Sequence, residues 1–196
     1  MAEREAPDAL VVIDIQRDDF RGGKLPLQDP EAAAAMAGFL IERFRASGTP
    51  VIHVHHHAVR PGSTFLVPGT PGVEPWPSVH PIEGEPVLVK HFPNACLETG
   101  LNEVLDRIGA RTVGLCGMMT HMCVDATARQ AADLGYRILV AKDATATRSL
   151  TFGGTTVPAP AVHAAFLAAL NGTYGEVLPT PAIVARLDSA RETGAR

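Results

Sequence analysis

The chain lacks a segment that would take it into or across a membrane. None of its apolar runs approaches the roughly 20 residues that a membrane-spanning helix needs. The stretch from Met1 to Asp8 is polar and charged, without the apolar centre of a signal peptide. The three cysteines, Cys96, Cys116 and Cys123, have neither the number nor the spacing of a disulfide framework or a metal site. Such cysteine usage is typical of a reducing compartment, so we expect a cytoplasmic protein without a membrane partner.

A strong charge of either sign is also missing. The net charge of −4 over 196 residues gives no electrostatic reason to expect a nucleic-acid partner. Hydrophobic residues, in contrast, make up 46% of the chain, which is enough to bury one sizeable core. With no internal repeat and no low-complexity linker, residues 1–196 are expected to form a single domain.

Apolar segments alternate with helical patterns along most of the chain. Strands are expected at Ala9–Ile15, Pro50–His55, Pro86–Lys90, Arg111–Cys116, Tyr136–Ala141 and Tyr174–Leu178, and helices at Pro30–Arg45, Glu98–Ile108, Thr120–Leu134 and Ala159–Leu170. Near-continuous apolar strands separated by helices indicate an α/β fold, with a parallel sheet covered on both faces. In such sheets, ligands bind outside the carboxyl ends of the strands.

Two segments do not fit this alternation. Residues 58–85 are rich in proline and glycine, contain Phe65 and Trp76, and show no helical period. A loop of that length is usually functional or mobile, and we interpret it either as a cover over the carboxyl edge of the sheet or as a contact between subunits. Residues 148–160 form a Gly/Pro-rich loop ahead of an apolar helix.

The run from Gly114 to Val124 (GLCGMMTHMCV) places Cys123 in the first turn of an expected helix, just after a strand. Unpaired helix N–H groups and the helix dipole lower the pKa of a thiol there, which favours a nucleophilic thiolate. The alternative is an inert core cysteine, which is the favoured interpretation for Cys116 and Cys96.

Two further charged residues lie at strand ends. Asp14 ends an apolar strand, where a carboxylate is costly unless it is paired or hydrogen-bonded. Lys90 ends the third strand, and a simple solvated lysine or a structural ion pair with Asp14 is an alternative to a catalytic role. Asp18 and Asp19 follow in a loop, where solvent exposure is the simpler expectation.

Taken together, these residues resemble the isochorismatase-like cysteine hydrolases, a family that includes nicotinamidases and N-carbamoylsarcosine amidohydrolases. The resemblance rests on Asp14 with nearby Phe20, on Lys90 followed by Phe92, and above all on the run from Gly117 to Val124. It covers nearly the whole chain. It implies a doubly wound, mostly parallel six-stranded sheet with helices on both faces, in agreement with the element pattern.

The resemblance also implies an Asp–Lys–Cys triad formed by Asp14, Lys90 and Cys123. Asp14 would take the thiol proton, Lys90 would favour the charged forms, and Cys123 would attack a carbonyl to give a thioester. It further implies a cis peptide between Met118 and Met119, which would aim the Met119 and Cys123 N–H groups at an oxyanion. Members of the family assemble, so a homo-oligomer, a dimer or larger, is expected.

Histidines suggest a metal site that the resemblance does not support. Nicotinamidases carry an Asp-x-His pair and a later histidine as metal ligands, whereas this strand reads His53-Val-His55-His56-His57 without the aspartate. A pocket-lining strand end or a subunit contact is favoured, a metal at His53, His55 and His57 stays open, and we assign no metal and no cofactor. Substrate-pocket candidates are Phe20, Trp76, His121 and Met122; His121 belongs equally well to the hydrogen bonding of the helix start.

The sequence thus predicts an amidohydrolase, a hydrolase of non-peptide C–N bonds, that cleaves a small amide or lactam through a thioester. Two alternatives remain. The first is an isochorismatase-type hydrolase that cleaves a vinyl ether by acid catalysis without a thiol. The second is a non-catalytic binding or assembly subunit. The presence of Cys123 argues against the first, and the complete set of triad residues argues against the second.

Overall fold

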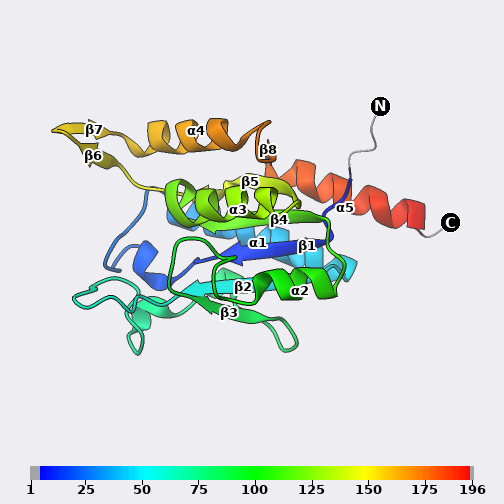
Figure 1. The fold of residues 1–196 in the computed structure, drawn as a ribbon, viewed down its shortest axis with the longest axis horizontal. Coiled ribbons are helices and arrows are strands. Elements are labelled where there is room, and N and C mark those ends of the chain that lie inside the picture. The colour runs from blue at the N-terminus through cyan, green and yellow to red at the C-terminus, as the bar shows by residue number, and fades with distance from the viewer. Residues whose placement is uncertain (1–4, 195–196) are drawn as a thin grey trace.

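A sheet of six parallel strands forms the centre of the computed structural model, which describes residues 5–194 (Figure 1). The strands are β1 (Ala9–Ile13), β2 (Val51–His56), β3 (Val87–Lys90), β4 (Thr112–Met118), β5 (Arg137–Ala146) and β8 (Glu176–Leu178). They lie in the order β3-β2-β1-β4-β5-β8, and every neighbouring pair is parallel. The predicted doubly wound α/β fold is therefore confirmed.

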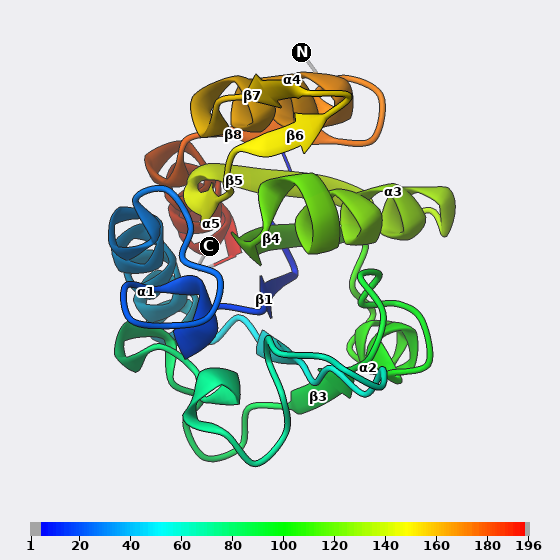
Figure 2. The same ribbon diagram turned by 90° about the vertical axis from the view of Figure 1, so that its left-hand side faces the viewer.

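Helices cover both faces of this sheet (Figure 2). On one face lie α1 (Pro30–Ser47) and α5 (Thr180–Gly194), and on the other α2 (Leu101–Arg107), α3 (Asp125–Asp133) and α4 (Ala159–Leu170). Successive residues of β1 point to opposite faces, so Leu10 and Val12 join the core under α1 and α5, whereas Val11 and Ile13 join the core under α2 and α3. Burial on both faces explains the near-continuous apolar run of β1.

Several element boundaries differ from the expected ones. Strand β1 stops at Ile13 because Asp14 adopts a left-handed backbone with a φ of 49°. Helix α2 begins only at Leu101, since Glu98 and Gly100 also have positive φ. The helix expected from Thr120 consists of a π-helical turn, Thr120–Val124, followed by α3.

Two elements were missed. The loop expected at residues 148–160 contains an antiparallel hairpin of β6 (Leu150–Phe152) and β7 (Thr155–Val157), joined by Gly153-Gly154. A Gly-Gly pair between short β-prone runs is a hairpin signal. Helix α5 was also missed, although Thr180-Pro181 ahead of the spaced apolar residues Ile183, Val184 and Leu187 is a helix-start pattern.

Residues 57–86, which connect β2 to β3, contain only two short 3₁₀ turns, Pro71–Val73 and Pro77–Val79. The segment that follows β1 holds this loop in place: Gln16 Nε2 donates to the Val73 carbonyl at 2.8 Å, and the Trp76 N–H donates to the Ile15 carbonyl at 2.9 Å. The Trp76 ring stacks on Phe20 with 3.7 Å between ring centroids. These contacts support the interpretation of the loop as a cover over the carboxyl edge of the sheet.

Within the described residues, no helix combines the length and the apolar character needed to cross a membrane.

Candidate active site

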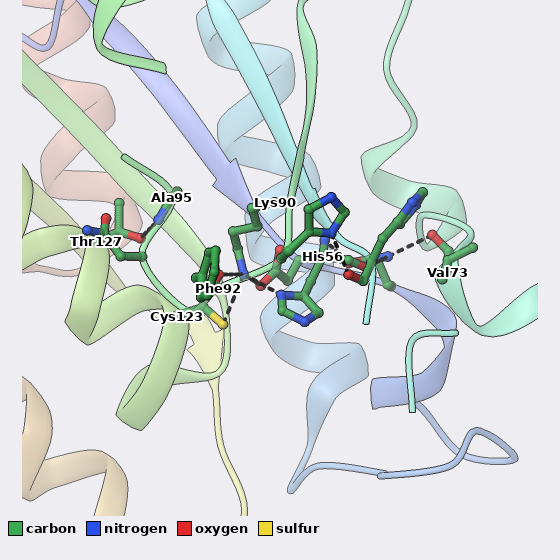
Figure 3. Close-up of polar contacts among 12 residues, drawn as sticks. His56, Val73, Lys90, Phe92, Ala95, Cys123 and Thr127 are labelled. Carbon is green, nitrogen blue, oxygen red and sulfur yellow. Dashed lines mark hydrogen bonds and ion pairs between the residues drawn. The ribbon is translucent and has the colours of Figure 1, made fainter. Parts of the chain in front are cut away.

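Asp14, Lys90 and Cys123 come together at the carboxyl edge of the sheet. Asp14 follows β1, Lys90 ends β3 and Cys123 lies in the π-helical turn after β4. The strand order reverses at β1 and β4, which makes this edge the expected ligand site of a doubly wound sheet. Lys90 Nζ lies 2.6 Å from Asp14 Oδ2 and 3.2 Å from Cys123 Sγ (Figure 3).

The Lys90 ammonium is enclosed by acceptors. Besides Asp14 and Cys123, it contacts the Phe92 carbonyl oxygen at 3.1 Å and His56 Nδ1 at 3.0 Å, and Figure 3 shows Lys90 beside Phe92, His56 and Cys123. Burial alone would lower the pKa of Lys90, but the Asp14 carboxylate and Cys123 outweigh it and raise the pKa above its ordinary value.

Burial lowers the pKa of His56, and the Lys90 charge lowers it further. His56 is therefore a neutral imidazole that accepts through Nδ1 from Lys90.

Asp14 is a buried carboxylate, and Lys90 is its ion-pair partner. Its side chain is 3% exposed and forms the ion pair with Lys90, while Oδ1 has no hydrogen-bond partner among the described residues. The left-handed backbone at Asp14 turns the chain out of β1, and its N–H still donates to the Val54 carbonyl at 2.9 Å. One carboxylate oxygen thus remains available beside the thiol.

Cys123 corrects one expectation of the sequence analysis. Burial raises the pKa of the Cys123 thiol far above its ordinary value, the Asp14 carboxylate raises it further, and Lys90 only partly opposes them. The prediction of a pKa lowered by the helix start is therefore wrong, because desolvation and a neighbouring negative charge outweigh the helix N–H groups. The raised pKa favours the thiol form of Cys123, and the reaction of a thiol as a nucleophile requires a base.

The turn between β4 and Cys123 depends on Gly117. Its φ is 138°, and a Cβ atom on it would lie 2.0 Å from the Ile13 carbonyl oxygen of the neighbouring strand. The peptide bond between Met118 and Met119 is cis. Because β1 and β4 pack this closely at their ends, only glycine fits where the chain turns toward Cys123.

Gly117→Ala is expected to lower the free energy of unfolding by at least about 2 kcal/mol, since both the positive φ and the contact with Ile13 are strained for alanine. Gly114→Ala, in the same strand, is the matched control, because its Cβ would meet no atom closer than 3.4 Å. Urea unfolding measures both variants. Equal effects would contradict the steric role assigned to Gly117.

A cavity of about 240 Å³ opens beside Asp14 and Cys123. Its apolar wall consists of Leu25, Phe65, Leu66, Pro93, Met118, Met119 and Met122. Its polar groups, besides Asp14 and Cys123, are Asp19, His56 and Arg148. Sequence reasoning placed Met122 in the pocket and missed Asp19, His56 and Arg148. Arg148 adds a cationic side chain to the cavity wall, and its buried Nε has no hydrogen-bond partner among the described residues.

Three of the expected pocket residues lie elsewhere. Phe20 is fully buried in the core, and the Trp76 ring that stacks on it borders a neighbouring cavity. His121 hydrogen-bonds Thr147 through Nδ1 and packs edge-on against Phe166 of α4. Trp76 differs from the expected position because its ring stacks on Phe20. His121 differs because its ring contacts Thr147 and Phe166 of α4.

Asp18 and Asp19 also correct an expectation. They are 5% and 2% exposed, respectively, rather than solvated. The covering loop contacts Asp18, because the Leu66 N–H donates to Asp18 Oδ2 at 2.7 Å. A contact between residues so distant in the sequence leaves no signal in the local polarity of the loop.

The histidines of β2 are engaged in separate contacts. His53 Nε2 lies 2.8 Å from Glu85 Oε2, and His56 contacts Lys90. Burial, together with the smaller effect of the nearby His53, lowers the pKa of His55 to about 4. Residues 5–194 contain no group of three or more His, Cys, Asp or Glu side chains placed to hold a metal ion. The donor set of a nicotinamidase-type metal site is therefore not assembled here.

Comparison with known proteins gives consistent matches. The family profile of the isochorismatase domain matches residues 8–181. The isochorismatase family protein YddQ of Bacillus subtilis is 48% identical over 176 residues, which cover 90% of this chain and 98% of that protein. Streptothricin hydrolase of Streptomyces noursei is 35% identical over 90% of this chain and 63% of its own length. Maleamate amidohydrolase of Pseudomonas putida is 30% identical over 87% and 82%, respectively.

Solved structures agree with these sequence matches. An isochorismatase from Pseudomonas putida superposes with a TM-score of 0.85 at 34% identity and covers 93% of this chain and 93% of its own. N-carbamoylsarcosine amidase from Thermoplasma acidophilum superposes with a TM-score of 0.74 at 29% identity and covers 88% of this chain and 95% of its own.

Proposed function

The chain belongs to the isochorismatase family of hydrolases, and we propose that it cleaves a C–N bond of a small amide or lactam through a thioester on Cys123. One observation carries this proposal: Lys90 Nζ lies 2.6 Å from Asp14 Oδ2 and 3.2 Å from Cys123 Sγ at the wall of one cavity. Two of the relatives described above, maleamate amidohydrolase and N-carbamoylsarcosine amidase, have names that point to the cleavage of amides, and a third, streptothricin hydrolase, is named as a hydrolase.

The first half of the reaction forms the thioester. Asp14 takes the proton from the Cys123 thiol, and the resulting thiolate attacks the carbonyl carbon of the amide. When the tetrahedral intermediate collapses, the C–N bond breaks and the proton passes from Asp14 to the leaving nitrogen. Lys90 remains charged throughout and stabilises whichever of Asp14 and Cys123 is negative.

The second half returns the enzyme to its resting state. Asp14, again a carboxylate, takes a proton from a water molecule that attacks the thioester carbonyl. The carbon–sulfur bond breaks, the acid leaves, and Cys123 recovers its proton from Asp14. The raised pKa of the Cys123 thiol supports this cycle, because the thiol is the resting form and a base beside it has a role in each half.

We assign the oxyanion site to the N–H groups of Met119 and Cys123. Both residues line the cavity, and both belong to the turn that follows Gly117. Backbone N–H groups held by a rigid turn stabilise a developing oxyanion without having to reorganise.

The cavity favours a small substrate. Its volume of about 240 Å³ lies below the roughly 300–1,000 Å³ of pockets for drug-sized ligands. Its wall is mostly apolar, while Arg148 offers a cationic donor for a polar or anionic group of the substrate.

A panel of small amides and lactams, assayed for released ammonia or amine with and without a chelator, tests the proposal. We expect activity that does not change when the chelator is present, because the described residues assemble no metal site. The panel should include isochorismate with pyruvate as the readout. Pyruvate release that persists in a Cys123→Ala variant, with no amide cleaved, would instead support vinyl-ether hydrolysis.

We also propose that the protein is a homo-oligomer and that the β6–β7 hairpin takes part in the contact. The hairpin projects from the carboxyl side of the sheet beside α4 (Figure 1), and Phe152 near its tip is 91% exposed. Phe152→Ser is expected to lower the molar mass measured by light scattering after gel filtration, because an exposed aromatic of this kind is stabilised by burial in a contact. Val59→Ser, at an apolar residue of the covering loop that is 58% exposed, is the matched control.

A further inference from the structure

Asp18 and Asp19 are adjacent carboxyl groups with different surroundings. Asp18 accepts hydrogen bonds from the Lys24 N–H at 3.1 Å and the Leu66 N–H at 2.7 Å, so it holds two loop segments together. Asp19 instead lines the cavity that contains Cys123, and Asp18 borders a neighbouring cavity. The first carboxyl group therefore has a structural role that the second does not share.

Asp19 is a buried polar group without a complete set of partners. Its side chain is 2% exposed, and its Oδ1 is buried with no hydrogen-bond partner among the described residues. Burying a polar atom in this way is destabilising unless something pairs with it. Asp19 belongs to the cavity wall, so a molecule held in the cavity can approach this carboxyl group and pair with it.

The charges around Asp19 favour its neutral form. Burial raises the pKa of this carboxyl well above its ordinary value, and the carboxylates of Asp14 and Asp18 raise it further. A backbone hydrogen bond from Gln16 and the charge of Lys90 oppose these effects and are weaker. Besides Asp14 and Asp19, the polar residues that line this cavity are His56, Cys123 and Arg148.

A neutral carboxyl group is both a donor and an acceptor of hydrogen bonds, whereas an ionised one only accepts. The neutral form is therefore suited to a carbonyl oxygen of a ligand, and the ionised form to an ammonium group. The two forms select different substrates.

We propose that Asp19 is a specificity-determining residue whose neutral carboxyl group donates a hydrogen bond to a second carbonyl oxygen of the substrate. The substrate class is then a small amide that carries another carbonyl group beyond the scissile one, as in a diamide, an imide or an amide of a diacid. This inference rests on the proposed function, since it takes the cavity beside Cys123 as the substrate site.

Three probes of similar length separate the possibilities: butanamide, succinamide and 4-aminobutanamide. Their binding is measured by calorimetry on the Cys123→Ala protein, so that no turnover is needed. Succinamide is expected to bind about fivefold to tenfold more tightly than butanamide, because its second carbonyl oxygen accepts one additional hydrogen bond from Asp19. Asp19→Asn should keep most of this preference, because the amide still donates a hydrogen bond, and Asp19→Leu should abolish it.

Other outcomes would overturn the inference. Tightest binding of 4-aminobutanamide, lost in Asp19→Asn, would indicate an ionised Asp19 that recognises a cation. An unchanged preference in Asp19→Leu, or no binding of any probe, would remove Asp19 from substrate recognition. Infrared spectroscopy gives an independent readout: the carbonyl band of a protonated carboxyl group at neutral pH should disappear in Asp19→Asn. Turnover by the protein that retains Cys123 tests the proposed function separately.

Discussion

Replacing Cys123 with alanine is expected to lower kcat/KM for amide hydrolysis by at least about a thousandfold, because it removes the atom that forms the thioester. The variant should remain folded, since Cys123 is a small side chain at a cavity wall and its loss removes one contact of Lys90 while the ion pair with Asp14 remains. The substrate is expected to bind with little change in affinity, so that the effect falls on kcat.

Cys96→Ser is the matched control for this experiment. Cys96 is half-buried and lies outside the lining of the Cys123 cavity. Its replacement should leave kcat/KM within about twofold of the parent value, because a substitution remote from the reacting atoms leaves transition-state stabilisation unchanged. Mass spectrometry of the quenched parent enzyme should detect an acyl group on Cys123. A Cys123→Ala protein that hydrolyses the amide as fast as the parent would refute the mechanism.

The positions of Asp14, Lys90 and Cys123 could be predicted because they depend on a general property of the fold. Each follows or ends a strand, and a parallel sheet gathers the carboxyl ends of its strands on one edge. The apolar context of Asp14 also required a partner, which the structure provides in Lys90. Polarity at the end of a buried strand is thus a signal that local sequence can carry.

Other features of the site could not be predicted, because they depend on contacts between distant segments. Asp19 is buried and lines the same cavity as Phe65 and Leu66 of the covering loop, and nothing in its own sequence neighbourhood indicates this. The pKa of Cys123 has a similar origin. The start of a helix lowers the pKa of a thiol, but the burial of Cys123 and the nearby Asp14 carboxylate have the larger effect and raise it. The hairpin, in contrast, has a local signal in its sequence, the Gly153-Gly154 pair between β6 and β7.

Lys90→Met is expected to lower the free energy of unfolding by about 3–5 kcal/mol, because it leaves the buried Asp14 carboxylate without its ion-pair partner. Arg43→Met is the control, since the pair of Arg43 and Asp188 is more than one-third exposed on both sides, and breaking a pair of this kind costs about 1 kcal/mol or less. Urea unfolding measures both variants. A similar small loss in the two would contradict a tightly coupled Asp14–Lys90 pair.

The double variant Asp14→Asn/Lys90→Met distinguishes a charge effect from a packing effect. If the cost of Lys90→Met is the unpaired carboxylate, then Asp14→Asn should recover a part of the lost stability, and the two single effects should not add. If the cost is lost packing of the lysine stem, the effects should add within about 0.5 kcal/mol. Activity should not recover in either case, because the proposed reaction needs the Asp14 carboxylate as a base and the Lys90 charge beside it. Recovery of stability without activity therefore separates the structural part of the pair from its part in the reaction.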